Sequence, residues 1–97
     1  MLHTVNKSPY GHSALDECVR VVSTGSTILL IEDGVYAAKK GAGYEGKLKA
    51  AMEKVTIAAL GPDLAARGIK ECADGVTVVD YDGFVDLVAA NKMTAWV

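Results

Sequence analysis

Four consecutive apolar residues, from Ile28 to Ile31, constrain the fold of this chain more than any other feature. The run shows no alternation of polar and apolar positions, and Asp33-Gly34 closes it shortly afterwards. A strand of this kind is typically buried on both faces, as in a parallel sheet that is covered by helices. The run therefore predicts the centre of an α/β domain.

Strand-sized and helix-sized segments alternate along the rest of the chain. Leu15, Cys18 and Val22 recur at helical spacing and give the first helix one apolar face. Such alternation predicts parallel strands that are joined by right-handed crossovers. We expect a small three-layer α/β domain with a mostly parallel sheet of four to five strands. Strands are expected over residues 1–5, 27–31, 55–60 and 76–79, and helical segments over 13–22, 35–39, 44–54, 64–67 and 81–90.

Length and composition set the class of protein. The 97 residues are enough for a single domain over 1–97 but not for two. No apolar run approaches the roughly 20 residues of a membrane-spanning helix, and no signal peptide is recognisable, so we expect a cytoplasmic protein without membrane contact. The net charge of −2 lacks the basic excess of a nucleic-acid binder. The tail, Met93 to Val97, is too apolar for a free terminus, and we expect Trp96 to be buried between subunits or against its own fold.

Charge is spread unevenly along the chain. Residues 39–54 contain five lysines against two glutamates, whereas residues 71–97 contain five acidic residues against Lys92 alone. Two patches of opposite sign could orient partner proteins, although solvated faces are the commoner reason for such runs.

The two cysteines, Cys18 and Cys72, are 54 positions apart and form no CxxC motif. In a cytoplasmic chain they are expected to be reduced, and with two histidines beside them a zinc site is not expected. Considered from its neighbours alone, Cys18 is more easily explained as a packed small residue than as a nucleophile, since Asp16 and Glu17 disfavour a thiolate.

Two short motifs suggest ligand sites but have structural explanations. Residues 41–46 spell GxGxxG, yet they follow a helical segment and not a strand, which is the wrong context for a dinucleotide fingerprint. Asp33-Gly34 follows the second strand, at the sheet edge where α/β proteins bind ligands. We expect Asp33 to cap a helix that begins at Val35, and Gly34 to permit the turn.

Five blocks in series resemble the DsrH/TusB family of sulfur-relay proteins. Residues 1–9 are similar to its opening LHT(V/L)xxSP, 33–38 to DGVxAA, 63–68 to DLxARG, 80–87 to DYxxFVxL, and Ala95-Trp96 to its terminal AW. These blocks occur in the family's order and span the whole chain. They place Asp33, Gly34, Arg67, Gly68 and Trp96 among the family's structural motif residues.

The resemblance implies a DsrE-like domain, which is a flavodoxin-like arrangement, in a cytoplasmic heterohexamer with DsrE-like and DsrF-like subunits. Such complexes exchange persulfide sulfur with small carrier proteins that are TusA-like or DsrC/TusE-like. In sulfur oxidisers the DsrEFH complex serves oxidative sulfur metabolism; in the TusB branch the relay supplies 2-thiolation of the tRNA wobble uridine. The principal acceptor cysteine belongs to the DsrE/TusD partner. No organic cofactor or metal is implied, and the isolated chain is expected to be able to form homo-oligomers.

The branch and the role of the thiol are separate questions. Residues 13–18 resemble the first helix of DsrH, where a cysteine occupies the position of Cys18, and residues 5–9 and 61–64 are also more similar to DsrH, so we favour the sulfur-oxidiser branch. This resemblance makes Cys18 the candidate persulfide carrier. A TusB-like subunit, or a purely structural subunit without thiol chemistry, is the alternative.

Overall fold

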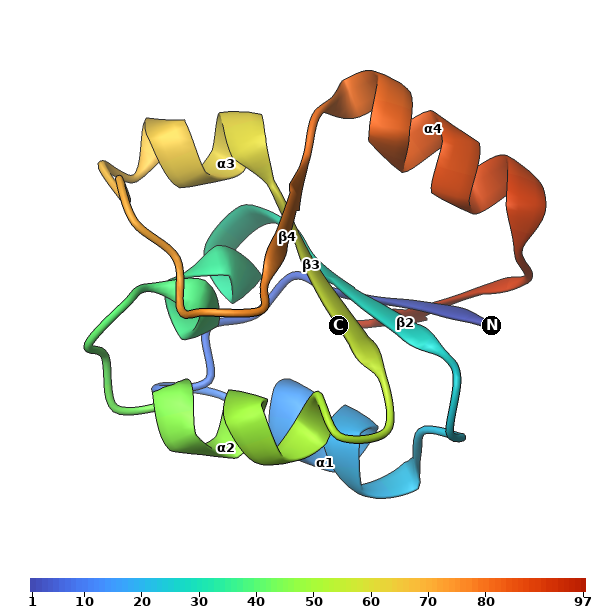
Figure 1. Cartoon of the computed structure of the whole chain (residues 1–97), viewed down its shortest axis with the longest axis horizontal. Coiled ribbons are helices and arrows are strands. Elements are labelled where there is room, and N and C mark those ends of the chain that lie inside the picture. Colours follow the sequence, from blue (N-terminus) through green and yellow to red (C-terminus); the bar gives the residue numbers. More distant parts are fainter.

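Five parallel strands form the centre of the molecule, in the spatial order β4-β3-β2-β1-β5 (Figure 1). The computed structural model describes all residues from 1 to 97. The strands are β1 (Leu2–Val5), β2 (Thr27–Leu30), β3 (Thr56–Leu60), β4 (Thr77–Val79) and β5 (Met93–Trp96). The helices are α1 (Ala14–Val21), the 3-10 helix η1 (Glu32–Ala38), α2 (Glu45–Ala51), α3 (Gly61–Ala66) and α4 (Tyr81–Ala90).

The three inner strands behave as their sequences predict. Every residue of β1 is buried, as are Ile28, Leu29 and Leu30 of β2. Their parallel register places Leu2 beside Thr27 and Val5 beside Leu30. The expected α/β fold is confirmed, with the sheet entirely parallel and five strands wide.

The two faces of the sheet are packed unequally. In Figure 1, α1 and α2 lie on one side of the sheet and α4 on the other. The side of α1 and α2 holds most of a core of 18 buried residues, which includes Leu15, Cys18 and Leu48. The opposite core consists of Leu2, Leu29 and Ala58, with partly buried side chains of α4 above them.

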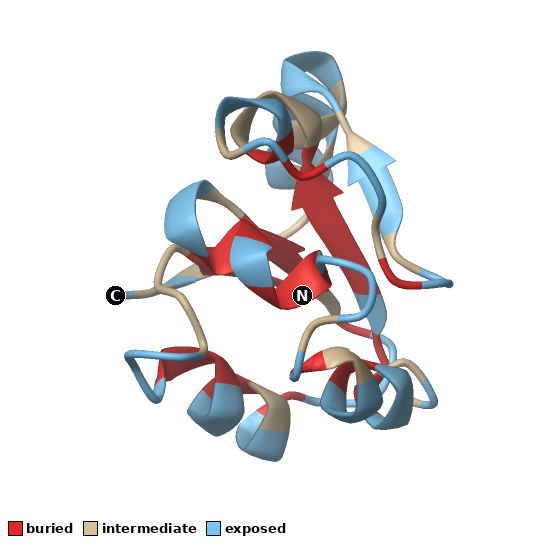
Figure 2. Ribbon diagram, turned by 90° about the vertical axis from the view of Figure 1, so that its left-hand side faces the viewer, coloured by how far each residue is buried: buried red, intermediate tan, exposed pale blue.

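Helix α4 consequently contains no buried residue, although it is apolar in composition. Figure 2 shows the contrast between the red central strands and the pale blue outer surfaces of the helices. None of the helices is long and apolar enough to cross a membrane.

Several element boundaries differ from the sequence expectation. The helix after β2 is a 3-10 helix that begins at Glu32, so Asp33 lies within it. Helix α3 begins at Gly61, and not at Leu64, because Pro62 fits the first turn of a helix, where its missing N–H is not needed. The apolar tail forms β5, which pairs with β1 along the edge of the sheet.

Candidate functional site

Asp33 and Arg67, which come from two separate blocks of the sequence, meet at the carboxyl ends of β2 and β3. The Nε of Arg67 donates a hydrogen bond to Oδ1 of Asp33 at 3.0 Å, and Nη1 donates to the backbone oxygen of Asp63 at 3.2 Å. The carboxylate of Asp63 accepts from the backbone N–H of Glu32 at 2.7 Å. Arg67 and Asp63 thus tie α3 to the start of η1.

This network corrects the expectation for Asp33. Its side chain does not cap a helix that begins at Val35, because η1 has no side-chain cap and the Asp33 carboxylate is turned toward Arg67. The pairing partner lies 34 positions further along the chain, so local capping preferences could not identify it. Asp33-Gly34 and Ala66-Arg67-Gly68 are separate in sequence, and the hydrogen bond between Arg67 and Asp33 joins them in the fold.

Only glycine fits at position 34, because the neighbouring backbone leaves no space for a Cβ atom. A Cβ built there would lie 2.2 Å from the backbone oxygen of Val5, closer than any side-chain atom can approach. Gly68 is required for a different reason, since its φ of 69° is in the left-handed region after helix α3. Both glycines therefore determine the backbone conformation beside the hydrogen bonds of Arg67. Neither glycine by itself forms a binding site for a ligand.

Cys18 lies on the inner face of α1, and no part of it is accessible to solvent. Burial raises the pKa of its thiol to about 11. A thiol with this pKa is almost wholly protonated at neutral pH, and persulfide chemistry requires the thiolate. In the folded chain Cys18 therefore has the properties of a packed core residue.

Cys72 is partly buried and packs against the same core. Burial raises the pKa of this thiol as well. Its backbone pairs with Lys39 in an isolated bridge, which joins the segment before β4 to the end of η1. Neither thiol is thus activated within the isolated chain.

The glycine-rich loop offers no phosphate site. It follows η1, and the backbone N–H of Gly41 donates to the carboxylate of Glu45. An acidic side chain thus occupies a donor that a phosphate would need. No group of three or more His, Cys, Asp or Glu side chains is arranged to hold a metal ion.

Trp96 is half-buried against its own fold. Its indole Nε1 donates a hydrogen bond to Nδ1 of His3 at 3.1 Å, across the β1–β5 pair. Because Nδ1 accepts, the neutral imidazole of His3 carries its proton on Nε2. Burial, together with the charge of the N-terminus, lowers the pKa of His3. The motif tryptophan therefore anchors the edge strand to β1.

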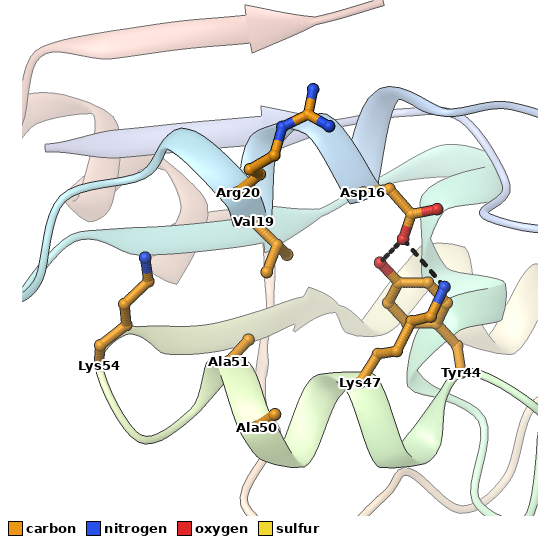
Figure 3. Close-up of a pocket in the computed structure, with 8 residues that line it drawn as sticks. All are labelled: Asp16, Val19, Arg20, Tyr44, Lys47, Ala50, Ala51 and Lys54. Atoms are coloured by element: carbon orange, nitrogen blue, oxygen red, sulfur yellow. Dashed lines mark hydrogen bonds and ion pairs between the residues drawn. The ribbon is translucent and has the colours of Figure 1, made fainter.

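A groove of about 360 Å³ runs between α1 and α2 (Figure 3). Val19, Ala50 and Ala51 line it with apolar groups, and Arg20, Lys47 and Lys54 lie around them. The Tyr44 hydroxyl donates to Asp16 at 2.6 Å, and Lys47 lies 3.5 Å from the same carboxylate. The Tyr44 hydrogen bond and the charge of Lys47 hold the pKa of Asp16 below its usual value. Arg20 and Lys54 form no ion pair.

Comparison with known proteins places the chain in a family. The model of the family described as "DsrH like protein" matches residues 7–94. The chain belongs to the DsrH/TusB family. Protein TusB of Pectobacterium parmentieri is 39% identical over 98 residues, which cover 99% of this chain and 100% of that protein. Protein TusB of Escherichia coli K12 is 38% identical over 100 residues, with the same coverage.

Solved structures support the fold of this DsrH/TusB family member. The ychN protein of E. coli superposes with a TM-score of 0.78 and 17% identity over 97% of each chain. The protein MTH1491 of Methanobacterium thermoautotrophicum gives a TM-score of 0.73 and 18% identity, covering 97% of this chain and 95% of that one. At these identities the likeness concerns the fold alone.

Proposed function

We propose that this chain is a subunit of a cytoplasmic sulfur-relay complex, in which it supplies contact surfaces and not the sulfur-carrying thiol. The observation that carries the relay assignment is the full-length identity of 39% to a protein named TusB. The partners we propose are the DsrE-like and DsrF-like subunits of a heterohexamer, with TusA-like and DsrC/TusE-like proteins as carriers.

The chemistry of a relay explains why the thiol is assigned elsewhere. An acceptor thiolate attacks the outer sulfur of a donor persulfide, a new S–S bond forms, and the donor's S–S bond breaks to release the donor as a thiolate. With a pKa of about 11, Cys18 is a thiolate in about one molecule in ten thousand at pH 7. It is also inaccessible to a carrier protein. These properties favour a subunit that positions the acceptor cysteine of its DsrE/TusD partner.

Within the family we propose the TusB branch, in which the relay serves 2-thiolation of the tRNA wobble uridine. The sequence favours the sulfur-oxidiser branch through residues 5–9, 13–18 and 61–64, although the burial of Cys18 disfavours a role for that cysteine as a sulfur carrier. Full-length relatives at 38–39% identity carry the name TusB. The branch assignment therefore rests on identity over the whole chain.

Deletion of the gene in its own host tests the branch. The expected result is loss of 2-thiouridine from tRNA hydrolysates, measured by liquid chromatography with mass spectrometry, and its return on complementation. Unchanged 2-thiouridine together with impaired oxidation of stored sulfur would instead assign the chain to the DsrEFH branch.

A second candidate function is a persulfide carrier of the DsrH type, and the presence of Cys18 on α1 favours it. This function requires α1 to expose Cys18 within the complex. Sulfur transfer by complexes that contain wild-type chain, Cys18→Ser or Cys72→Ser distinguishes the two functions. Loss of transfer in Cys18→Ser alone would support the carrier, whereas equal rates in all three support the contact subunit.

A further inference from the structure

Helix α4 presents an apolar surface that nothing in the chain covers. Tyr81 and Val85, one helical turn apart, are 60% and 63% exposed, and Val88 is also exposed. These three side chains follow one another at helical spacing along one exposed face of α4, and apolar surface of this kind typically marks a protein contact.

The charges of α4 limit what can cover this surface. Asp82 and Asp86 lie directly after Tyr81 and Val85 in sequence, and both are exposed. The helix contains no lysine or arginine. Two copies of α4 packed against each other would bring four carboxylates together without a counter-charge, which is unfavourable at an interface. The partner surface must therefore be apolar and positively charged.

The groove between α1 and α2 is apolar in its floor and is bordered by Arg20, Lys47 and Lys54, and its one carboxylate, Asp16, is engaged by Tyr44 and Lys47. Its apolar part consists of Val19, Ala50 and Ala51, whose small side chains allow close approach of another helix. Arg20 and Lys54 border it without an ion pair of their own. At 360 Å³, the groove is large enough for apolar side chains to enter.

The two surfaces cannot meet within one chain, because α1 and α2 lie on one side of the sheet and α4 on the other (Figure 1). A contact between them joins different surfaces of two molecules. Such a head-to-tail contact either closes into a ring or continues as a chain of subunits.

We propose that α4 of one copy of this chain docks into the α1–α2 groove of a second copy, with Tyr81 and Val85 over its apolar floor. Asp82 and Asp86 then face Arg20 and Lys54. Burial of the apolar residues supplies most of the affinity, and the charges select the head-to-tail arrangement. This contact does not depend on the sulfur-relay function, since it is a property of the isolated chain.

Charge reversal tests this pairing in the purified full-length chain. Sedimentation velocity over a range of concentrations compares the wild type with Arg20→Glu/Lys54→Glu and with Asp82→Lys/Asp86→Lys. We expect the wild type to self-associate and each double variant to dissociate with a Kd raised about tenfold or more. An equimolar mixture of the two variants should associate again, because the reversed groove accepts the reversed helix.

A matched variant controls for net charge. Lys49 and Lys70 are exposed and do not line the groove, so Lys49→Glu/Lys70→Glu should associate as the wild type does. Circular dichroism verifies that all variants fold. A monomeric wild type, or groove variants that associate as strongly as the wild type, would overturn the proposal. Failure of the mixture to reassociate, with both variants folded, would overturn it as well.

Discussion

The guanidinium of Arg67 lies 3.0 Å from the carboxylate of Asp33, a residue 34 positions earlier in the chain. The contact joins the end of helix α3 to η1, at the carboxyl edge of the sheet. The same arginine also donates to the backbone oxygen of Asp63. Two motifs that are separate in sequence are therefore one structural unit, and their role is to hold this edge together.

Replacing Arg67 with alanine should destabilise the chain by about 1–2 kcal/mol. The Arg67 side chain is largely buried, at 22% exposed, and its removal leaves the oxygen of Asp63 without this donor. The Asp33→Asn variant should cost less, about 0.5 kcal/mol, because Asp33 is 61% exposed. Urea denaturation of the two variants checks the order. Equal losses of unfolding free energy in the two variants would contradict the prediction that the contacts of the buried arginine contribute most of the stability at this site.

Replacing Gly34 with alanine should destabilise the chain by about 3 kcal/mol or more, or prevent folding. The added methyl group would lie 2.2 Å from the oxygen of Val5, and both partners of the clash are held by backbone. Gly46→Ala is the matched control, because a Cβ there meets nothing within 4 Å and α2 gains a better helix former. Thermal unfolding of both variants measures the difference. A Gly34→Ala chain as stable as the control would show that η1 can move away from the end of β1 without cost.

Because the Cys18 thiol is buried, we expect the folded chain to lose stability at alkaline pH. Its pKa rises from 9.0 to about 11 on folding, so the folded chain retains a proton that the unfolded chain releases. The stabilisation is complete below pH 9 and is lost as the pH rises toward 11. The Cys18→Ala variant lacks this titration. Between these limits the wild type should therefore lose about 2–3 kcal/mol more than the variant.

Denaturant titrations at several pH values, in a Cys72→Ala background, measure this difference. The background substitution is needed because burial also raises the pKa of Cys72. Parallel stability curves for the two proteins would mean that Cys18 is exposed in solution.

The His3–Trp96 hydrogen bond predicts an acid transition that tryptophan fluorescence can follow. Trp96 is the single tryptophan, and protonation of His3 at Nδ1 removes the acceptor of its indole N–H. Because folding lowers the pKa of His3 below 6.5, its contribution to stability is complete above pH 6.5 and is lost as the pH falls from 6.5 through the lower pKa of the folded chain. The fluorescence change should occur below pH 6.5, disappear in His3→Gln and persist in His12→Gln. Persistence in His3→Gln would assign the transition to another group.

The sequence predicted the parts of this structure that local patterns determine. The unbroken apolar run in β2 indicated a parallel sheet, and the spacing of Leu15, Cys18 and Val22 indicated the buried face of α1. Asp33 was assigned the wrong role because its partner, Arg67, comes close only after the sheet has formed. The exposure of Val85 was equally beyond a local pattern, since an apolar helix normally signals burial in its own chain. The groove that Arg20 and Lys54 border could not be predicted either. Its width depends on the distance between α1 and α2, which sequence spacing does not specify.

The central claim is that this subunit takes part in a sulfur relay without carrying sulfur itself. Intact-mass spectrometry of the assembled complex, purified with its DsrE-like and DsrF-like subunits and incubated with a persulfide donor, tests it most directly. We expect the partner subunit to gain sulfur while the mass of this chain stays unchanged. Gain of one sulfur atom by the wild-type chain, and its absence in Cys18→Ser, would contradict the claim.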